Sequence, residues 1–354
     1  MRLLDETWSA STEGRVRGSP VLGDRTVYVG STDGRVYAVD RDTGEVRWTF
    51  HTGSSTVHRP VIHENTILTA AGAALYAIDR ASGTAVWEVR DRHFMHAPVV
   101  DDDLLFAYAA DRQGWRLYAL DFTGETRWMV DRTVAEAELL QSNLAVTDGA
   151  VFVASWNGIL AFDRQNGHVR WTVDWPQCIE SIVSDGRSLY AGARTIDSSA
   201  NVLAIDPARG SITWTQRIQA GEWITAVSLH DGVLYTSGIE PTSGGTKTRR
   251  VAALSVPDGE VMWSVITNAR SASSVPPRMV SVSDGHDVAT GDAGVSILDA
   301  IDGTIQQRLR PETSVHTRPA VSAGEVIVGS DDGHIYAFEG NPEAGQSESI
   351  TRGR

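Results

Sequence analysis

The chain has 354 residues, of which 41% are hydrophobic and 21% are charged, a composition typical of a globular protein. Its 45 acidic and 31 basic residues leave a net charge of −14, which argues against nucleic acid or an anionic membrane as the main partner. The single cysteine, Cys178, excludes an intrachain disulfide.

The N-terminal segment MRLLDETWSAST lacks the apolar stretch of a signal peptide, and no apolar run approaches the roughly 20 residues of a membrane span. We therefore expect a cytoplasmic protein, or an extracytoplasmic one if a leader precedes this sequence. Lys247 is the only lysine among the 31 basic residues. This acidic, arginine-rich bias is similar to that of salt-adapted proteins, and GC-rich coding produces it as well.

A repeat runs through the chain and is marked by tryptophan. Seven tryptophans lie 39 to 49 residues apart, at Trp8, Trp48, Trp87, Trp128, Trp171, Trp214 and Trp263, and an eighth equivalent position holds Gln307. A turn that carries glycine four residues ahead of the marker precedes all of these positions except that of Trp8. These glycines are Gly44, Gly83, Gly124, Gly167, Gly210, Gly259 and Gly303.

Each repeat reads as four short strands, which in the first copy are SPVLG, TVYVG, VYAVD and EVRWTF. The strand sets fall at 19–50, 59–89, 97–130, 144–173, 181–216, 226–265 and 276–309, and an eighth set at 317–340 lacks its fourth strand. Residues 3–10 contain a spare strand that can complete this last set. Only residues 133–141, in a connection, look helical.

Four-stranded units of this length, repeated radially, are typical of a β-propeller. We therefore predict an all-β fold, an eight-bladed β-propeller of four-stranded antiparallel blades closed by the N-terminal strand. It forms a single domain over residues 1–340, and the polar segment 341–354 is a disordered tail. A tryptophan between neighbouring blades buries ~150–250 Å², which stabilises the fold by at most roughly 4–6 kcal/mol. The seven repeat tryptophans are therefore predicted to be structural.

The turns between the second and third strands and the links between blades share one face of an antiparallel propeller, which we call the top face. Its loops include 109–116, 192–201 and 238–250. The four tryptophans outside the repeat position also fall there, in or between blades 3 to 6. Because loops carry function more often than packed strands, we expect a ligand or partner site on this face. The candidate residues are Trp115, Trp156, Trp175, Glu180, Glu222, Trp223, Arg270 and Arg278.

A second group of residues precedes the innermost strands and is predicted to surround the mouth of the central channel. This channel rim comprises His58, Arg59, His96, His316 and Arg318. A histidine cluster can bind metal or titrate near neutral pH, and it can equally pack and hydrogen-bond at the rim. The acidic runs at 101–103 and 330–333 lack a third carboxylate in calcium-loop register, so we expect no metal there.

The pattern D-x-x-[TSN]-G-x-x-x-W resembles the repeats of the pyrroloquinoline quinone (PQQ)-like propeller family over residues 3–340. This family includes quinoprotein dehydrogenases and the BamB-like lipoproteins of outer-membrane assembly. The catalytic branch carries a vicinal cysteine pair and an Asn/Glu/Asp calcium set. Here Cys178 is alone and no calcium set can be matched, so the resemblance implies the non-catalytic or BamB-like branch.

We therefore expect a monomeric, non-catalytic binding or scaffold module, without a cofactor and with no catalytic residues. A protein segment or small ligand would bind its top face. One alternative is a PQQ- and calcium-dependent sugar or alcohol oxidoreductase, or a degenerate relative of one. Another is a BamB-like protein-assembly factor, which requires a secretion signal.

Overall fold

The computed structural model of the protein describes residues 4–55, 57–90, 92–94, 96–111, 114–131, 139–176, 178–194, 200–218, 223–241, 247–271, 280–283, 286–291, 294–309, 314–322 and 324–340. The tail 341–354, predicted to be disordered, lies outside these residues. So does most of the segment 133–141, which looked helical. Its last three residues are the start of a β-strand, so the helical interpretation is wrong for them.

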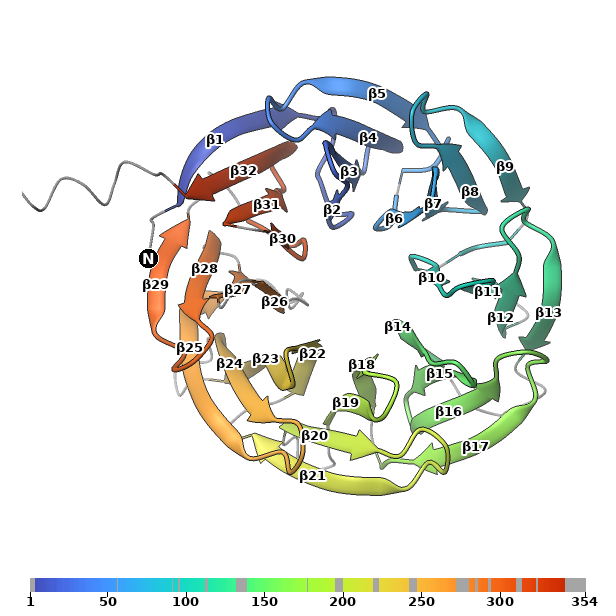
Figure 1. The fold of residues 1–354 in the computed structure, drawn as a ribbon, viewed down its shortest axis with the longest axis vertical. Coiled ribbons are helices and arrows are strands. Elements are labelled where there is room, and N and C mark those ends of the chain that lie inside the picture. Colours follow the sequence, from blue (N-terminus) through green and yellow to red (C-terminus); the bar gives the residue numbers. More distant parts are fainter. Residues whose placement is uncertain are drawn as a thin grey trace, which may run out of the picture.

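The described strands form eight four-stranded antiparallel sheets arranged as the blades of a ring (Figure 1). The first strand of each blade lies nearest the centre and the fourth strand lies at the periphery. Seven blades are continuous segments of the chain, in which each strand pairs with the next. The remaining sheet has the order β1-β32-β31-β30 and joins the two ends of the chain.

The strands of the first four blades have the following bounds. Blade 1 contains β2 (Val21–Leu22), β3 (Thr26–Gly30), β4 (Arg35–Asp40) and β5 (Val46–His51). Blade 2 contains β6 (Val61–His63), β7 (Thr66–Ala71), β8 (Ala74–Asp79) and β9 (Ala85–Arg90). Blade 3 contains β10 (Val99–Val100), β11 (Leu105–Asp111), β12 (Gly114–Leu120) and β13 (Thr126–Asp131). Blade 4 contains β14 (Leu139–Val146), β15 (Ala150–Ser155), β16 (Gly158–Asp163) and β17 (Val169–Asp174).

The other four blades follow the same plan. Blade 5 contains β18 (Ile179–Ser184), β19 (Leu189–Arg194), β20 (Ala200–Ile205) and β21 (Ile212–Ile218). Blade 6 contains β22 (Trp223–His230), β23 (Val233–Pro241), β24 (Lys247–Ser255) and β25 (Val261–Ser271). Blade 7 contains β26 (Val280–Ser283), β27 (His286–Gly291), β28 (Gly294–Asp299) and β29 (Ile305–Leu309). Blade 8 contains β30 (Ala320–Ser322), β31 (Glu325–Gly329), β32 (His334–Gly340) and β1 (Leu4–Ser11).

The N-terminal strand closes the ring, as predicted. β1 pairs antiparallel with β32 from Leu4 opposite Gly340 to Ser11 opposite His334, with a bulge between Glu6 and Trp8. The pairing supplies the fourth strand that the C-terminal segment lacks. It also covers the edge that β32 would otherwise expose for pairing with another chain.

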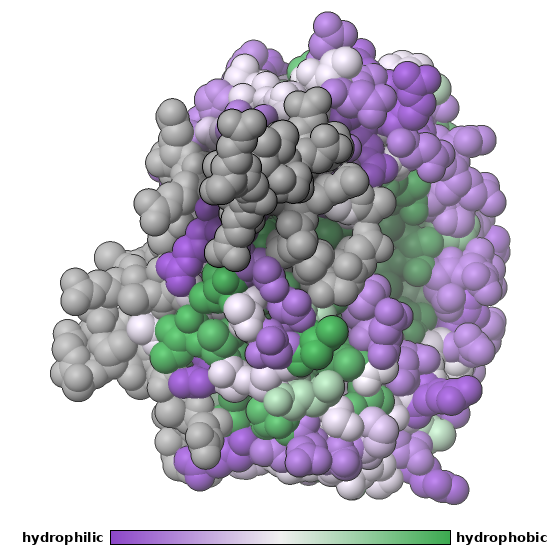
Figure 2. Space-filling model, turned by 60° about the vertical axis from the view of Figure 1, so that its left-hand side comes forward, coloured by the Kyte–Doolittle hydropathy of each residue, from purple (hydrophilic) through white to green (hydrophobic). Residues whose placement is uncertain are grey.

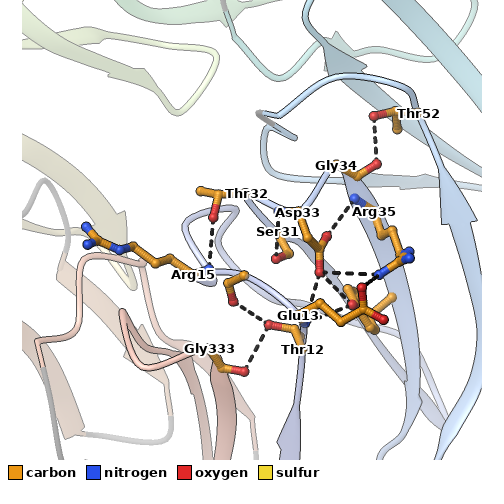
Figure 3. Close-up of polar contacts among 12 residues, drawn as sticks. Thr12, Glu13, Arg15, Ser31, Thr32, Asp33, Gly34, Arg35, Thr52 and Gly333 are labelled. Atoms are coloured by element: carbon orange, nitrogen blue, oxygen red, sulfur yellow. Dashed lines mark hydrogen bonds and ion pairs between the residues drawn. The ribbon is translucent and has the colours of Figure 1, made fainter.

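Beyond β1, the chain crosses from blade 8 to blade 1 through a network of polar contacts (Figure 3). The backbone N–H of Thr12 donates to the carbonyl of Gly333 at 2.7 Å, which anchors the link to blade 8. The backbone N–H of Glu13 donates to Asp33 at 3.0 Å, and the carboxylate of Glu13 pairs with Arg35 of blade 1. Residues 12–15 therefore join the last blade to the first.

The hydrophobic core lies between the blades. The second and third strands are almost fully buried, whereas the fourth strands β5 and β9 alternate between exposed and half-buried residues. Each of the eight apolar clusters combines residues of two neighbouring blades, as where Tyr28 of blade 1 packs with Ile67 and Tyr76 of blade 2. One twisted sheet cannot bury both of its faces alone, so the blades depend on one another.

The outer surface is mainly polar. In Figure 2, hydrophilic residues cover much of the visible rim, and hydrophobic residues lie in patches between them. The apolar residues that are exposed on the fourth strands include Val46, Met129, Val169, Ile212 and Ile266. They are single positions on different blades, and scattered exposure of this kind is ordinary for a globular protein.

The repeat tryptophans connect each blade to the next. In all seven, the indole Nε1–H donates to a backbone carbonyl in the turn between the third and fourth strands of the following blade, at 2.7–3.1 Å. The indole ring also lies against the glycine of that turn. A Cβ placed on Gly83 would stand 2.6 Å from Trp48, so this glycine makes the close approach possible.

Candidate functional site

Trp156 is the tryptophan that best fits the predicted top-face site. It lies in the turn between β15 (Ala150–Ser155) and β16 (Gly158–Asp163), and half of its surface is exposed. Gly158 follows with a φ of +141°, a conformation that favours glycine and allows this tight connection. The turn thus holds a large apolar ring in solvent, although neither the repeat contacts nor the core requires it.

The predicted loop position of Trp115 is wrong. The sequence placed it in a loop over residues 109–116, but the hairpin is tighter than expected, because β11 extends to Asp111 and β12 begins at Gly114. Trp115 therefore lies within β12 opposite Ala110, where it is only 6% exposed. It packs in the apolar cluster between blades 3 and 4, beside Tyr108 and Leu117, so it belongs to the core.

Trp175 lies in the link between blades 4 and 5 and contacts the core. It is half-buried against the cluster between blades 4 and 5, and its indole Nε1–H donates to the carbonyl of Arg194 at 2.8 Å. This bond holds the link between blades 4 and 5 against the hairpin β19–β20, so Trp175 has a structural role. Trp223 is the first residue of β22, and only its backbone is described.

Of the polar candidates on the top face, the structure describes the side chain of Glu180 alone. Arg270 lies in β25, which runs to Ser271, and only its backbone is described. Glu222 and Arg278 fall outside the described residues. Glu180 lies in β18 and accepts a hydrogen bond from the thiol of Cys178 at 3.0 Å. Burial and the nearby carboxylate raise the pKa of Cys178 to about 12, so the thiol stays protonated and unreactive at neutral pH.

Two of the three channel-rim histidines lie together. The ring centroids of His58 and His96 are 5.8 Å apart, and His96 also stacks at 6.4 Å on Tyr108. Burial lowers the pKa of His58, although a hydrogen bond with the backbone of Phe94 opposes the effect. Burial also raises the pKa of Tyr108 to about 12. His58 is therefore neutral at neutral pH, as expected of a packed ring.

His316 takes another partner. Its Nε2 lies 3.5 Å from the carboxylate of Asp331, which also accepts hydrogen bonds from Arg17 at 3.1 and 3.2 Å. Among the described residues, no group of three or more His, Cys, Asp or Glu side chains is placed to hold a metal ion. In the acidic run 101–103, Asp101 and Asp103 both pair with Arg164.

The two channel-rim arginines border a cavity of about 410 Å³ at the centre of the ring. Its wall is formed by the inner strands of blades 1, 6, 7 and 8, together with Arg59 of blade 2. Arg318 reaches across this wall to two serines, with Nε–H donating to Ser281 at 3.0 Å and an Nη donating to Ser228 at 2.8 Å.

The two serines were not among the site residues predicted from the sequence. Ser228 is paired with Tyr235, just as Val21 of blade 1 is paired with Tyr28, so it occupies an apolar position of the repeat. Ser281 is paired with Val288 and occupies the same position in blade 7. A serine at a repeat position that is otherwise apolar was the signal that could have identified them. The sequence could not show the contact itself, because Ser228 and its partner Arg318 are 90 residues apart.

Comparison with curated proteins finds a relative that matches slightly less than half of this chain. The serine/threonine-protein kinase AfsK of Streptomyces griseus is 29% identical over 175 residues. The match covers 45% of this chain and 20% of the kinase, so this chain spans only a small part of that relative's length. No helix among the described residues is long and apolar enough to cross a membrane.

Several solved structures share the fold. The computationally designed Ika8 protein superposes with a TM-score of 0.75 at 16% identity, over 94% of this chain and 99% of the designed one. BamB from Moraxella catarrhalis superposes with a TM-score of 0.70 at 15% identity, over 95% of this chain and all of that one. Quinohemoprotein alcohol dehydrogenase from Comamonas testosteroni gives a TM-score of 0.72 at 14% identity, over 95% and 76% of the two chains.

A family model described as outer membrane protein assembly factor BamB matches residues 51–172, 99–237 and 247–343. The first two segments overlap, and the three together span most of the ring, in agreement with the repeat contacts of the tryptophans and glycines. The chain therefore belongs to the PQQ-like β-propeller repeat family of BamB.

Proposed function

We propose that the protein is a non-catalytic binding or scaffold module whose top face receives a protein segment or a small ligand. The observation that carries this proposal is Trp156, a tryptophan that is 50% exposed in a top-face turn. The seven repeat tryptophans make contacts between blades, and Trp115 and Trp175 pack against the core. Exposed tryptophans are common anchors of binding sites, where truncation often costs ~2 kcal/mol or more of binding free energy.

The relatives support a module of this kind. The region shared with the kinase is a fifth of that protein, so a repeat segment like this one occurs within a much longer chain of another activity. In a closed ring of antiparallel blades the strands pack against one another, so the sequences of the turns and links can vary to form a binding surface.

Substitution of Trp156 by alanine tests the proposal. Bound partners would be isolated from native lysate on the wild-type protein and identified, and their affinity would then be measured with purified components. We expect Trp156→Ala to weaken binding at least tenfold while the melting temperature stays within about 2 °C. The matched control is Ile301→Ala, because Ile301 is 83% exposed in a turn on the opposite face. Equal affinity of the wild type and Trp156→Ala would refute the top-face site.

Membership in the BamB family favours a second candidate, a role in protein assembly at the outer membrane. This role requires export, so fractionation of the source cells distinguishes the two candidates. Recovery of the protein with the periplasm or outer membrane, together with outer-membrane assembly proteins on cross-linking, would support the assembly role. Recovery in the cytoplasm would exclude it.

The oxidoreductase alternative is tested by incubation with PQQ and calcium. Bound-quinone absorbance together with dye-linked oxidation of alcohols or sugars would replace the binding-module proposal with an enzymatic one. We expect neither signal, because the sequence lacks the cysteine pair and the calcium set of the catalytic branch.

A further inference from the structure

Among the residues that the structure describes, the wall of the central cavity contains two arginines and no acidic side chain. The lining combines Arg59 and Arg318 with the hydroxyls of Ser228 and Ser281, and the remaining lining residues are proline, alanine, valine and leucine. Its volume of about 410 Å³ falls within the range of small-molecule sites, ~300–1,000 Å³. The cavity is thus cationic and apolar within a protein of net charge −14.

The two arginines occupy equivalent positions of the repeat. Arg59 precedes Pro60 and Arg318 precedes Pro319, each at the start of an inner strand, and Ser19 holds the same position before Pro20 in the blade between them. A residue before proline is restricted to extended conformations, so these three backbones enter the channel in a similar way. The hydroxyl of Ser19 accepts a hydrogen bond from the backbone N–H of Arg318 at 2.9 Å.

Arg318 is held in place by neutral groups. Its guanidinium donates to Ser281 and Ser228, whose side chains are buried. These hydroxyls orient the guanidinium and satisfy part of its five-donor capacity, but they leave its charge uncompensated. Among the described residues, neither Arg59 nor Arg318 pairs with a carboxylate.

Other arginines in this protein form ion pairs with carboxylates. Arg17 pairs with Asp331, Arg41 pairs with Glu325, and Arg164 pairs with Asp101. In the channel, by contrast, burial and then the charge of Arg59 lower the pKa of Arg318 to about 10. Arg59 is exposed to solvent, and partial desolvation by the surrounding protein lowers the pKa of its guanidinium. Two positive charges thus face one cavity, and no carboxylate of the described residues neutralises either of them.

We propose that this cavity binds a small organic anion, whose carboxylate or phosphate group lies between Arg59 and Arg318 and whose apolar body lies against Val21, Leu229 and Val282. Guanidinium groups match the geometry of both oxyanions, which can accept two parallel N–H bonds. The inference goes beyond the top-face proposal, because the ligand lies inside the ring and Trp156 takes no part in its binding.

Thermal unfolding and calorimetric titration with defined probes test this inference. The probes are benzoate, phenyl phosphate and inorganic phosphate, with neutral benzamide as the uncharged control and sodium chloride used to hold ionic strength constant. We expect benzoate or phenyl phosphate to stabilise the wild-type protein, and benzamide to have no effect. The comparison between benzoate and phenyl phosphate identifies the preferred head group.

Arg59→Gln removes one of the two charges without removing a described hydrogen bond. We expect it to weaken binding of the preferred probe at least tenfold and, with no anion present, to raise the melting temperature above that of the wild type. Arg25→Gln is the matched control, since Arg25 is an exposed arginine outside the cavity. It removes the same charge and should change neither the affinity for the anion nor the melting temperature.

Several results would overturn the proposal. One is that the anions stabilise the wild type and Arg59→Gln equally. Another is that they stabilise the wild type no more than benzamide does. A third is that Arg59→Gln melts at a lower temperature than the wild type when no anion is present. Inorganic phosphate binding as tightly as benzoate and phenyl phosphate would overturn the apolar part of the site. Since Trp156→Ala leaves the cavity unchanged, failure of one proposal does not entail failure of the other.

Discussion

Gln307 binds the backbone of Leu4 with both ends of its side-chain amide: the N–H of Leu4 donates to Oε1 at 2.8 Å, and Nε2 donates to the carbonyl of Leu4 at 2.7 Å. Gln307 occupies the repeat position that holds tryptophan in the other blades. In those blades the indole lies on a glycine turn of the next blade. Blade 8 has chain ends where that turn would be, so an amide that pairs with the first strand replaces the aromatic ring.

Gln307→Ala should therefore weaken the attachment of β1 to the ring. Two hydrogen bonds, each contributing ~0.5–1.5 kcal/mol, are lost together, so we expect a loss of about 1–3 kcal/mol in the free energy of unfolding. Amide exchange of residues 4–8 should become faster than in the wild type. Gln306→Ala is the control, because the side chain of Gln306 is exposed and its hydrogen bond among the described residues is to Asp299. Similar losses for the two variants would contradict this role of Gln307.

Gly83→Ala tests the contact between tryptophan and glycine. Gly83 has a φ of +71°, and an added Cβ would stand 2.6 Å from Trp48. Gly232 has a φ of +73° and no atom within 4 Å of the same point, so Gly232→Ala measures the backbone cost alone. We expect Gly83→Ala to lose ~1–3 kcal/mol more than Gly232→Ala in denaturant unfolding, because the interface is overpacked. Equal losses would show that the close contact is unimportant.

Deletion of residues 1–10 should do more damage than any single substitution. It removes most of the fourth strand of blade 8 and the indole of Trp8, which is 9% exposed and bonds to Arg41 of blade 1. The exposed edge of β32 is then open to pairing between molecules. We expect aggregation on size-exclusion chromatography or a large fall in melting temperature. A monomeric deletion variant of unchanged stability would refute the closure.

Acidification should destabilise the protein through His58 before the carboxylates titrate. Burial lowers the pKa of His58 below its ordinary value of 6.5, so the folded state favours the neutral ring. The stability that depends on this neutral form is fully present above pH 6.5 and is lost as the pH falls through the lower pKa of the folded state. His58→Gln should therefore flatten the decline in stability that begins as the pH falls below about 6.5. NMR titration of the His58 ring measures the shift directly.

The sequence was sufficient to predict the blades because each repeat carries its own local pattern. The alternation of strands, the turn glycines and the tryptophan spacing are fixed within about 40 residues, and the structure places them as neighbouring sheets. The unpaired strand in residues 3–10 indicated the closure for the same reason. The role of Gln307 was less visible, since its partner is Leu4, 303 residues away.

The candidate site was harder to predict, since exposure depends on where a hairpin turns. A difference of a few residues in the β11–β12 hairpin places Trp115 in the core, whereas the tight turn at Trp156 exposes a similar ring. The arginine cavity depends on side chains from several blades that meet at the centre. Position in the repeat identified Arg59 and Arg318, but their lack of acidic partners among the described residues is a property of the assembled ring.

The pairing of Leu4 with Gly340 also determines how the molecule responds to mechanical force. A pull applied between these two residues would load the β1–β32 ladder from one end and open its hydrogen bonds one after another, as in unzipping. Shearing, in which all the bonds of a ladder resist together, would require attachment at opposite ends of the two strands. The ring would therefore open at this one sheet under low force, and the seven continuous blades would be exposed to tension only afterwards.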